Sequence, residues 1–143
     1  MDEEILLKEY QNLCSDVKKI YVVPLINFQF KNTNYLYLLY KKFIEEEKNY
    51  GIIIESLSVF AHPKIVLSRL KKEKGILHYH WLEISDFRSL SGMIWKLLWI
   101  SLYKLMSGKI IWTIHNKFPH SNNFIFLNKI IIRYMAKKKI LYS

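Results

Sequence analysis

The chain has 143 residues, 51% of them hydrophobic and 15% aromatic, with only four glycines and three prolines, which suits one domain and excludes a disordered or collagen-like chain. Its one cysteine, Cys14, excludes an internal disulfide and a cysteine-based zinc site, and is typical of a reducing compartment such as the cytosol. Residues 87–143 hold ten bases and no acid and carry the entire net charge of +10, so an anionic partner, either nucleic acid or an acidic membrane surface, is one hypothesis for that part.

Helical and strand patterns alternate along the whole chain. Helices are indicated by apolar residues at helical spacing, and strands by short apolar runs bounded by polar or turn residues. In chain order, the predicted elements are helix 3–17, strand 19–25, helix 34–48, strand 51–55, helix 63–74, strand 76–81, helix 89–106, strand 109–115, helix 123–139 and the start of a strand at 140–143. This alternation is typical of βαβ units. The predicted fold class is therefore α/β, with a Rossmann-like parallel sheet flanked by helices, in a single domain over 1–143 in which 1–18 is a leading helix.

No stretch of the chain has the length of a membrane span. Such a span needs about eighteen or more apolar residues without interruption, and the longest candidate, 97–103, lies between Lys96 and Lys104. The first residues, Met1 to Glu4, are acidic where a signal peptide would be basic. The sequence therefore indicates a cytoplasmic location.

Histidines gather at two predicted strand ends, where ligands bind in parallel α/β sheets. One strand ends in the run from His78 to Trp81, and the next ends at His115, with His120 shortly after. Alternation places His78 and His80 on the same face of their strand and Tyr79 on the other. Three interpretations stay open: a site for a polar ligand, a zinc site completed by His115 and His120, and histidines that bond only to the protein itself.

Several common active-site motifs are missing. No Gly-x-Ser-x-Gly turn is present, which argues against a Ser/His/Asp hydrolase. Neither Gly-x-Gly-x-x-Gly nor a phosphate loop follows the first strand, whose exit reads Pro24-Leu25-Ile26. The sequence therefore predicts no phosphate cradle within the chain and no cofactor. A metal is not expected either, because nothing in the spacing of the histidines fixes a tetrahedral set of ligands.

From the third predicted strand onward, the chain resembles a known family. It reads His78-Tyr-His-Trp-Leu, then a helix that ends in Met-Ser-Gly-Lys, then Ile-Ile-Trp-Thr-Ile-His115-Asn116, and then Pro119-His120. This order is similar to the amino-terminal, acceptor-side domain of GT-B glycosyltransferases of the family 4-like kind. The resemblance extends from about Lys19 to the end of the chain, and the stretch 112–120 is its specific part.

The resemblance implies transfer of a sugar from a nucleotide-sugar donor to a glycan or lipid-linked acceptor at the cytoplasmic membrane face. It implies that His115 is catalytic and contacts the donor sugar, and that His78, His80, Asn116 and His120 line the same cleft and bind substrate. The family's glycine-rich turn after the first strand is missing, and its second, donor-binding domain is not among these 143 residues. The chain is therefore expected to be half of an enzyme, inactive by itself, with the donor bound through the missing domain.

The long helix predicted at 89–106 is apolar over most of its surface. The residues expected to face the sheet are Leu90, Ile94, Leu98 and Leu105, which leaves an apolar edge of Trp95, Trp99, Leu102 and Met106 beside Lys96 and Lys104. Either another helix covers this edge, or Trp95, Lys96, Trp99 and Lys104 contact an anionic membrane surface.

The alternative to an enzyme is a non-catalytic basic module that binds anionic membrane or nucleic acid. Nucleic acid is not expected as a partner, because the sequence has no recognisable recognition helix and its aromatic residues do not alternate with bases on one open face.

Overall fold

Five parallel strands form one sheet in the computed structural model, which describes residues 3–31, 33–82, 84, 86–114, 124–136 and 140–142. The strands are β1 (Lys19–Val23), β2 (Ile53–Ser56), β3 (Gly75–Tyr79), β4 (Lys109–Ile114) and β5 (Ile140–Tyr142). Their order is β2-β1-β3-β4-β5, and every neighbouring pair is parallel. The predicted α/β class, with a Rossmann-like parallel sheet, is confirmed.

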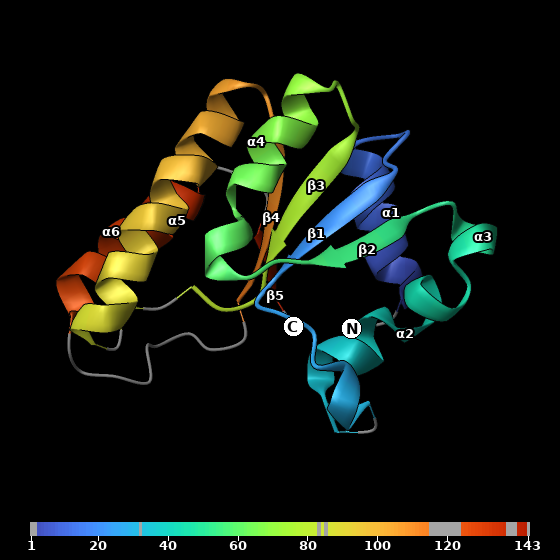
Figure 1. Ribbon diagram of the computed structural model, residues 1–143, viewed down its shortest axis with the longest axis horizontal. Helices are drawn as coiled ribbons and strands as arrows, with labels where there is room; N and C mark the ends of the chain where they lie inside the picture. The colour runs from blue at the N-terminus through green and yellow to red at the C-terminus, as the bar shows by residue number, and fades with distance from the viewer. Residues whose placement is uncertain are drawn as a thin grey trace.

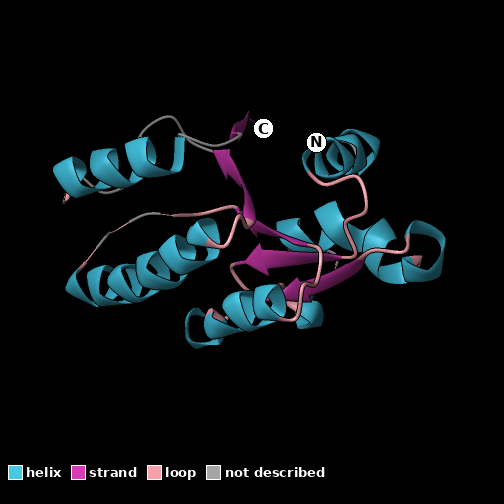
Figure 2. Ribbon diagram, turned by 90° about the horizontal axis from the view of Figure 1, so that it is seen from above, coloured by secondary structure: helices cyan, strands magenta, loops and turns pink. Residues whose placement is uncertain are grey.

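Helices cover both faces of the sheet. They are α1 (Glu3–Leu13), α2 (Tyr35–Glu45), α3 (Glu47–Tyr50), α4 (Pro63–Leu70), α5 (Phe87–Leu105) and α6 (Ile125–Ala136), with short 3-10 turns η1 (Phe28–Phe30) and η2 (Val59–Ala61). In Figure 1, α1 lies behind the strands and α4 in front of them, and Figure 2 shows the strands between these two helices from above. The side chains of α1 and α2 form one core with the sheet, and those of α4, α5 and α6 form another.

Side-chain caps define where two of the helices begin. The carboxamide of Asn34 accepts the backbone N–H of Tyr37 at 2.9 Å, which starts α2. Asp86 and Ser89 exchange side-chain and backbone hydrogen bonds in a capping box at the start of α5. Pro63 occupies the first turn of α4, as the sequence predicts.

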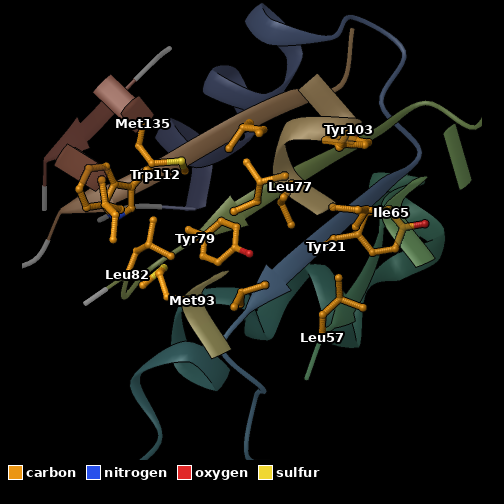
Figure 3. Close-up of a cluster of buried hydrophobic side chains, with 14 of the residues drawn as sticks. Tyr21, Leu57, Ile65, Leu77, Tyr79, Leu82, Met93, Tyr103, Trp112 and Met135 are labelled. Atoms are coloured by element: carbon orange, nitrogen blue, oxygen red, sulfur yellow. The ribbon is translucent and has the colours of Figure 1, made fainter. Parts of the chain in front are cut away.

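Alternation along β3 sends its side chains to opposite cores. Ile76 belongs to the core on the α1 and α2 side, whereas Leu77 and Tyr79 belong to the other. His78 lies on the same side as Ile76, since its ring contacts Tyr10 of α1, so the predicted opposition of His78 and Tyr79 is confirmed. Figure 3 shows the second core, in which strand residues meet helix residues; those labelled are Tyr21, Leu57, Ile65, Leu77, Tyr79, Leu82, Met93, Tyr103, Trp112 and Met135.

The orientation predicted for α5 is wrong. Met93, Ile100 and Tyr103 face the sheet, whereas the residues expected there are largely exposed: Ile94 is 63%, Leu98 50% and Leu105 81% exposed, and only Leu90 is partly buried. A helix that is apolar on nearly every side gives little contrast by which its inner face can be recognised. The result is an exposed apolar stripe along α5, consisting of Ile94, Leu98, Leu102 and Leu105.

Gly108, just after α5, lies against the buried ring of Tyr103, whose hydroxyl donates to the carbonyl oxygen of Gly75 at 2.8 Å. A Cβ at position 108 would lie 2.4 Å from carbons of that ring. We expect Gly108→Ala to lower the free energy of unfolding by about 1–3 kcal/mol, because the ring has to move. Gly92→Ala within α5 is the control: its Cβ would meet Val59 at 3.7 Å, an ordinary contact, and alanine should add up to about 1 kcal/mol. Urea unfolding measures both, and equal stabilities of the two variants would contradict the packing argument.

Candidate functional site

The strand order reverses between β1 and β3, because the chain passes from β1 outward to β2 and then returns to β3 on the other side of β1. Crevices at the carboxyl ends of the strands form at such a switch point. A hollow of about 450 Å³ lies there, lined by 23–25, 57–60, Trp81 and Lys96. A second hollow of about 600 Å³ adjoins it at the start of α5 and shares Val59, Phe60 and Lys96. We call the two together the strand-end groove.

The walls of the strand-end groove are largely apolar. Leu25 follows β1, Phe60 lies in η2 and Trp81 follows β3, and all three side chains are exposed, Phe60 by 86%. The Trp81 ring packs edge-on against Tyr35 of α2, with 6.1 Å between ring centroids. An apolar pocket with few polar groups is the usual form of a small-molecule site.

Lys96 of α5 supplies a positive charge where the two hollows meet. Its side chain is half-buried, and burial lowers the pKa of its ammonium below that of an ordinary lysine. It makes no ion pair with any residue that the structure describes. The groove therefore holds a partly desolvated cation within apolar walls.

His62 fixes the wall of the groove that η2 forms. Its Nδ1 donates to the carbonyl oxygens of Ser58 and Val59 at 2.9 Å, and its Nε2 accepts from the Tyr79 hydroxyl. Burial lowers the pKa of His62 despite these carbonyl contacts, and the nearby charge of Lys96 lowers it further. His62 is therefore neutral with its proton on Nδ1. The sequence alone did not single out this residue.

His78 and His80, predicted to bind substrate, are buried under the carboxyl end of the sheet, with 0% and 1% of their surface exposed. Nδ1 of His78 lies 2.7 Å from the hydroxyls of both Tyr10 and Tyr40, and its Nε2 lies 2.7 Å from Oγ1 of Thr113. Nε2 of His80 lies 2.8 Å from the Tyr40 hydroxyl. The Tyr40 hydroxyl also accepts from Tyr10 at 3.1 Å.

We call these five side chains the tyrosine–histidine network. It joins α1, α2, β3 and β4, and burial raises the pKa of the Tyr10 and Tyr40 hydroxyls, so both stay protonated donors. These hydrogen bonds hold both histidine rings in place at the carboxyl ends of the strands, while their contact with substrate stays a prediction. The sequence offers one signal for the network: a tyrosine on the buried face of a helix needs a polar partner.

The other predicted substrate residues, His115, Asn116 and His120, lie outside the described residues. His115 is next in sequence to the last residue of β4, Ile114, and β4 pairs with β3 over the stretch that ends with Tyr79 opposite Trp112. Its catalytic role stays a prediction.

The four predicted membrane contacts have different surroundings. Trp95 and Lys96 line the strand-end groove, and Trp95 is 38% exposed. Trp99 is half-buried, packs edge-on against Trp95 and leaves its indole N–H without a hydrogen-bond partner in the described part of the chain. The Lys104 ammonium reaches α6, 3.2 Å from the carbonyl oxygen of Tyr134 and 3.7 Å from the centre of its ring.

Among the described residues, no three His, Cys, Asp or Glu side chains are placed to hold a metal ion. No helix within those residues is long and apolar enough to cross a bilayer.

Comparisons with protein-family models, curated proteins and solved structures find no match to this chain.

The tyrosine–histidine network predicts a difference between two tyrosines of α2. Tyr40→Phe should lower the free energy of unfolding by about 1–3 kcal/mol, because Tyr10, His78 and His80 all lose their buried contact with the Tyr40 hydroxyl. Tyr37→Phe is the matched control: in the described part of the chain its hydroxyl bonds the exposed Glu45 on the same helix, at 3.0 Å, and its loss should cost about 0.5 kcal/mol. Thermal or urea unfolding compares the two, and a Tyr40→Phe variant no less stable than Tyr37→Phe would contradict the network.

Proposed function

We propose that this chain is the acceptor-side domain of a glycosyltransferase, which holds a glycan or lipid-linked acceptor while a second domain presents the nucleotide sugar. The observation that carries the proposal is the strand-end groove at the switch point between β1 and β3. In α/β proteins this is the place where ligands bind. The motif run from His78 to His120, which resembles that of family 4-like transferases, supports the same location, since β3 and β4 both lead to this edge of the sheet.

The groove suits an acceptor better than a nucleotide. Its apolar walls and exposed Trp81 fit the apolar face of a sugar ring or a lipid chain. The turn after β1 carries Pro24 and Leu25 instead of the glycines that let a backbone approach a diphosphate closely. The nucleotide sugar is therefore assigned to the second domain, and the acceptor to this one.

An anionic membrane surface is part of the proposal. The exposed apolar stripe of α5 runs along the helix that also lines the groove, so a membrane-bound acceptor would enter from the surface that the stripe contacts. Residues 87–143 contribute ten bases and no acid, which favours attraction to anionic lipid. A peripheral contact of this kind combines apolar burial with electrostatic attraction.

The stripe predicts which residues carry membrane binding. Leu98→Ser together with Leu105→Ser should weaken binding to phosphatidylglycerol-containing vesicles at least about tenfold, because both leucines would lose their apolar contact with lipid. Ile5→Ser with Leu38→Ser is the matched control, since these side chains are 55% and 47% exposed on the opposite face of the sheet. Sedimentation with vesicles measures the partition, and equal losses in both pairs would contradict a specific membrane face.

The transfer reaction is tested at His115. In a complete transferase, formed by this chain with a donor-binding domain in the same or a second polypeptide, His115→Ala should lower kcat at least about a hundredfold, because a polar contact at the reacting sugar acts mainly in the transition state. The readout is transfer of labelled sugar from nucleotide sugars to a lipid extract, with thermal unfolding as the control for folding. A variant with nearly normal turnover would remove His115 from the mechanism, and an assembly that binds vesicles but transfers no sugar would favour the basic binding module.

A further inference from the structure

Lys96 is placed differently from an ordinary surface lysine. Its side chain lines both hollows of the strand-end groove and is half-buried, and it forms no ion pair with a described residue. Asp86 and Arg88 line the second hollow together with Lys96. Asp86, which caps the same helix, is ten residues from Lys96, about 15 Å along the helix axis, and its carboxylate accepts the backbone N–H of Ser89 at 2.6 Å. His62, the titratable side chain close to it in the groove wall, is neutral.

The surroundings of Lys96 restrict what can neutralise it. On one side is the hollow lined by Leu25, Phe60 and Trp81, which is apolar apart from Ser58 and the lysine itself. A small inorganic anion would satisfy the charge but leave that hollow unfilled, and an apolar molecule would fill the hollow but leave the charge unpaired and more deeply buried. A ligand that combines one anionic group with an apolar chain satisfies both.

We propose that the strand-end groove binds a phosphate ester of an apolar chain, with the phosphate on the Lys96 ammonium and the chain in the hollow lined by Leu25, Phe60 and Trp81. This inference rests on the proposed function only in placing its ligand in the same groove, and it narrows the acceptor from a glycan or lipid-linked molecule to a lipid phosphate. A phosphate contact with a partly desolvated ammonium is a charge-assisted hydrogen bond, stronger than the same contact in open water. The second hollow is lined by Ser89, Ser91 and Arg88 and also by Asp86, so a polar group attached beyond the phosphate would meet both a base and an acid there.

The four tryptophans allow the binding to be followed in the intact chain. Trp81 and Trp95 line the two hollows, whereas Trp99 and Trp112 line neither. Farnesyl phosphate, kept below its critical micelle concentration in about 0.15 M salt, should shift the indole N–H signals of Trp81 and Trp95 in a saturable way. Farnesol, with the same chain and no phosphate, should bind at least about tenfold more weakly, and inorganic phosphate should give no saturable shift.

Variants of Lys96 separate this site from general attraction to a basic protein. Lys96→Met should weaken farnesyl phosphate binding at least about tenfold, and Lys96→Arg should largely retain it. Lys129→Met, an exposed position on α6 that is not among the residues lining either hollow, should leave the affinity unchanged. Because methionine removes a half-buried charge and keeps an apolar stem, Lys96→Met should unfold at the same or a higher temperature than the parent chain. Should that variant fail to fold, Lys96→Gln provides the same comparison.

Dihexanoyl phosphatidic acid, a short-chain membrane lipid, tests whether the phosphate that binds belongs to a lipid-linked acceptor or to a membrane phospholipid. Tighter binding of farnesyl phosphate supports a lipid-linked acceptor, whereas tighter binding of the phosphatidic acid supports the site but assigns it to membrane phospholipid and contradicts the link to the acceptor. Equal binding of farnesol and farnesyl phosphate, or full affinity in Lys96→Met, overturns the proposal. In either case the proposed sugar transfer is still judged separately, by the turnover of the complete transferase with glycan acceptors.

Discussion

The two central strands, β1 and β3, have to be covered on both faces, and the arrangement of the helices follows from that need. β3 is buried along its whole length, and β1 along all but Lys19. A parallel sheet meets this condition only when helices pack on each side. With α4, α5 and α6 on one face, the crossover helix α2 and the leading helix α1 together cover the other. The strand order then reverses between β1 and β3, so the strand-end groove is a consequence of the way the sheet is covered.

The strands could be predicted because their burial shows in the sequence. The runs that became β1 and β4 are apolar at nearly every position, and only a strand buried on both faces needs that pattern in so few residues. The inner face of α5 could not be predicted for the opposite reason. Ile94 and Leu98 look as suitable for the sheet as Met93 and Ile100 do, and the choice depends on where α4 and α6 pack, which no pattern within α5 contains.

In the candidate site, too, the features set by neighbouring residues could be predicted, whereas contacts between residues far apart in the sequence could not. Alternation along the strand predicts that His78 and His80 lie on one face. It does not show that the hydroxyls of Tyr10 and Tyr40, 68 and 38 residues before His78, form hydrogen bonds with the His78 ring. A histidine at a strand end can point to a ligand or to a partner within the core, and only the fold distinguishes the two. The sequence predicts a membrane contact for Lys96 because it lies beside an apolar edge that contains Trp95 and Trp99. The fold places it beside Phe60 and Trp81, residues whose position depends on η2 and β3.

The energetics of Lys96 connect stability with binding. An ammonium that is partly withdrawn from water and has no described counter-ion destabilises the folded chain relative to an apolar side chain of similar length. The same withdrawal from water strengthens its attraction to an anion that enters the groove, and it shields that attraction from salt better than at an exposed lysine. The bases of residues 87–143, of which Arg88, Lys109, Lys129 and Arg133 are exposed in the described part of the chain, can bring it to an anionic surface, but their attraction falls with ionic strength and does not discriminate between anions. Recognition of one phosphate therefore has to come from a charge held within apolar walls, and in the described part of the chain Lys96 meets that requirement.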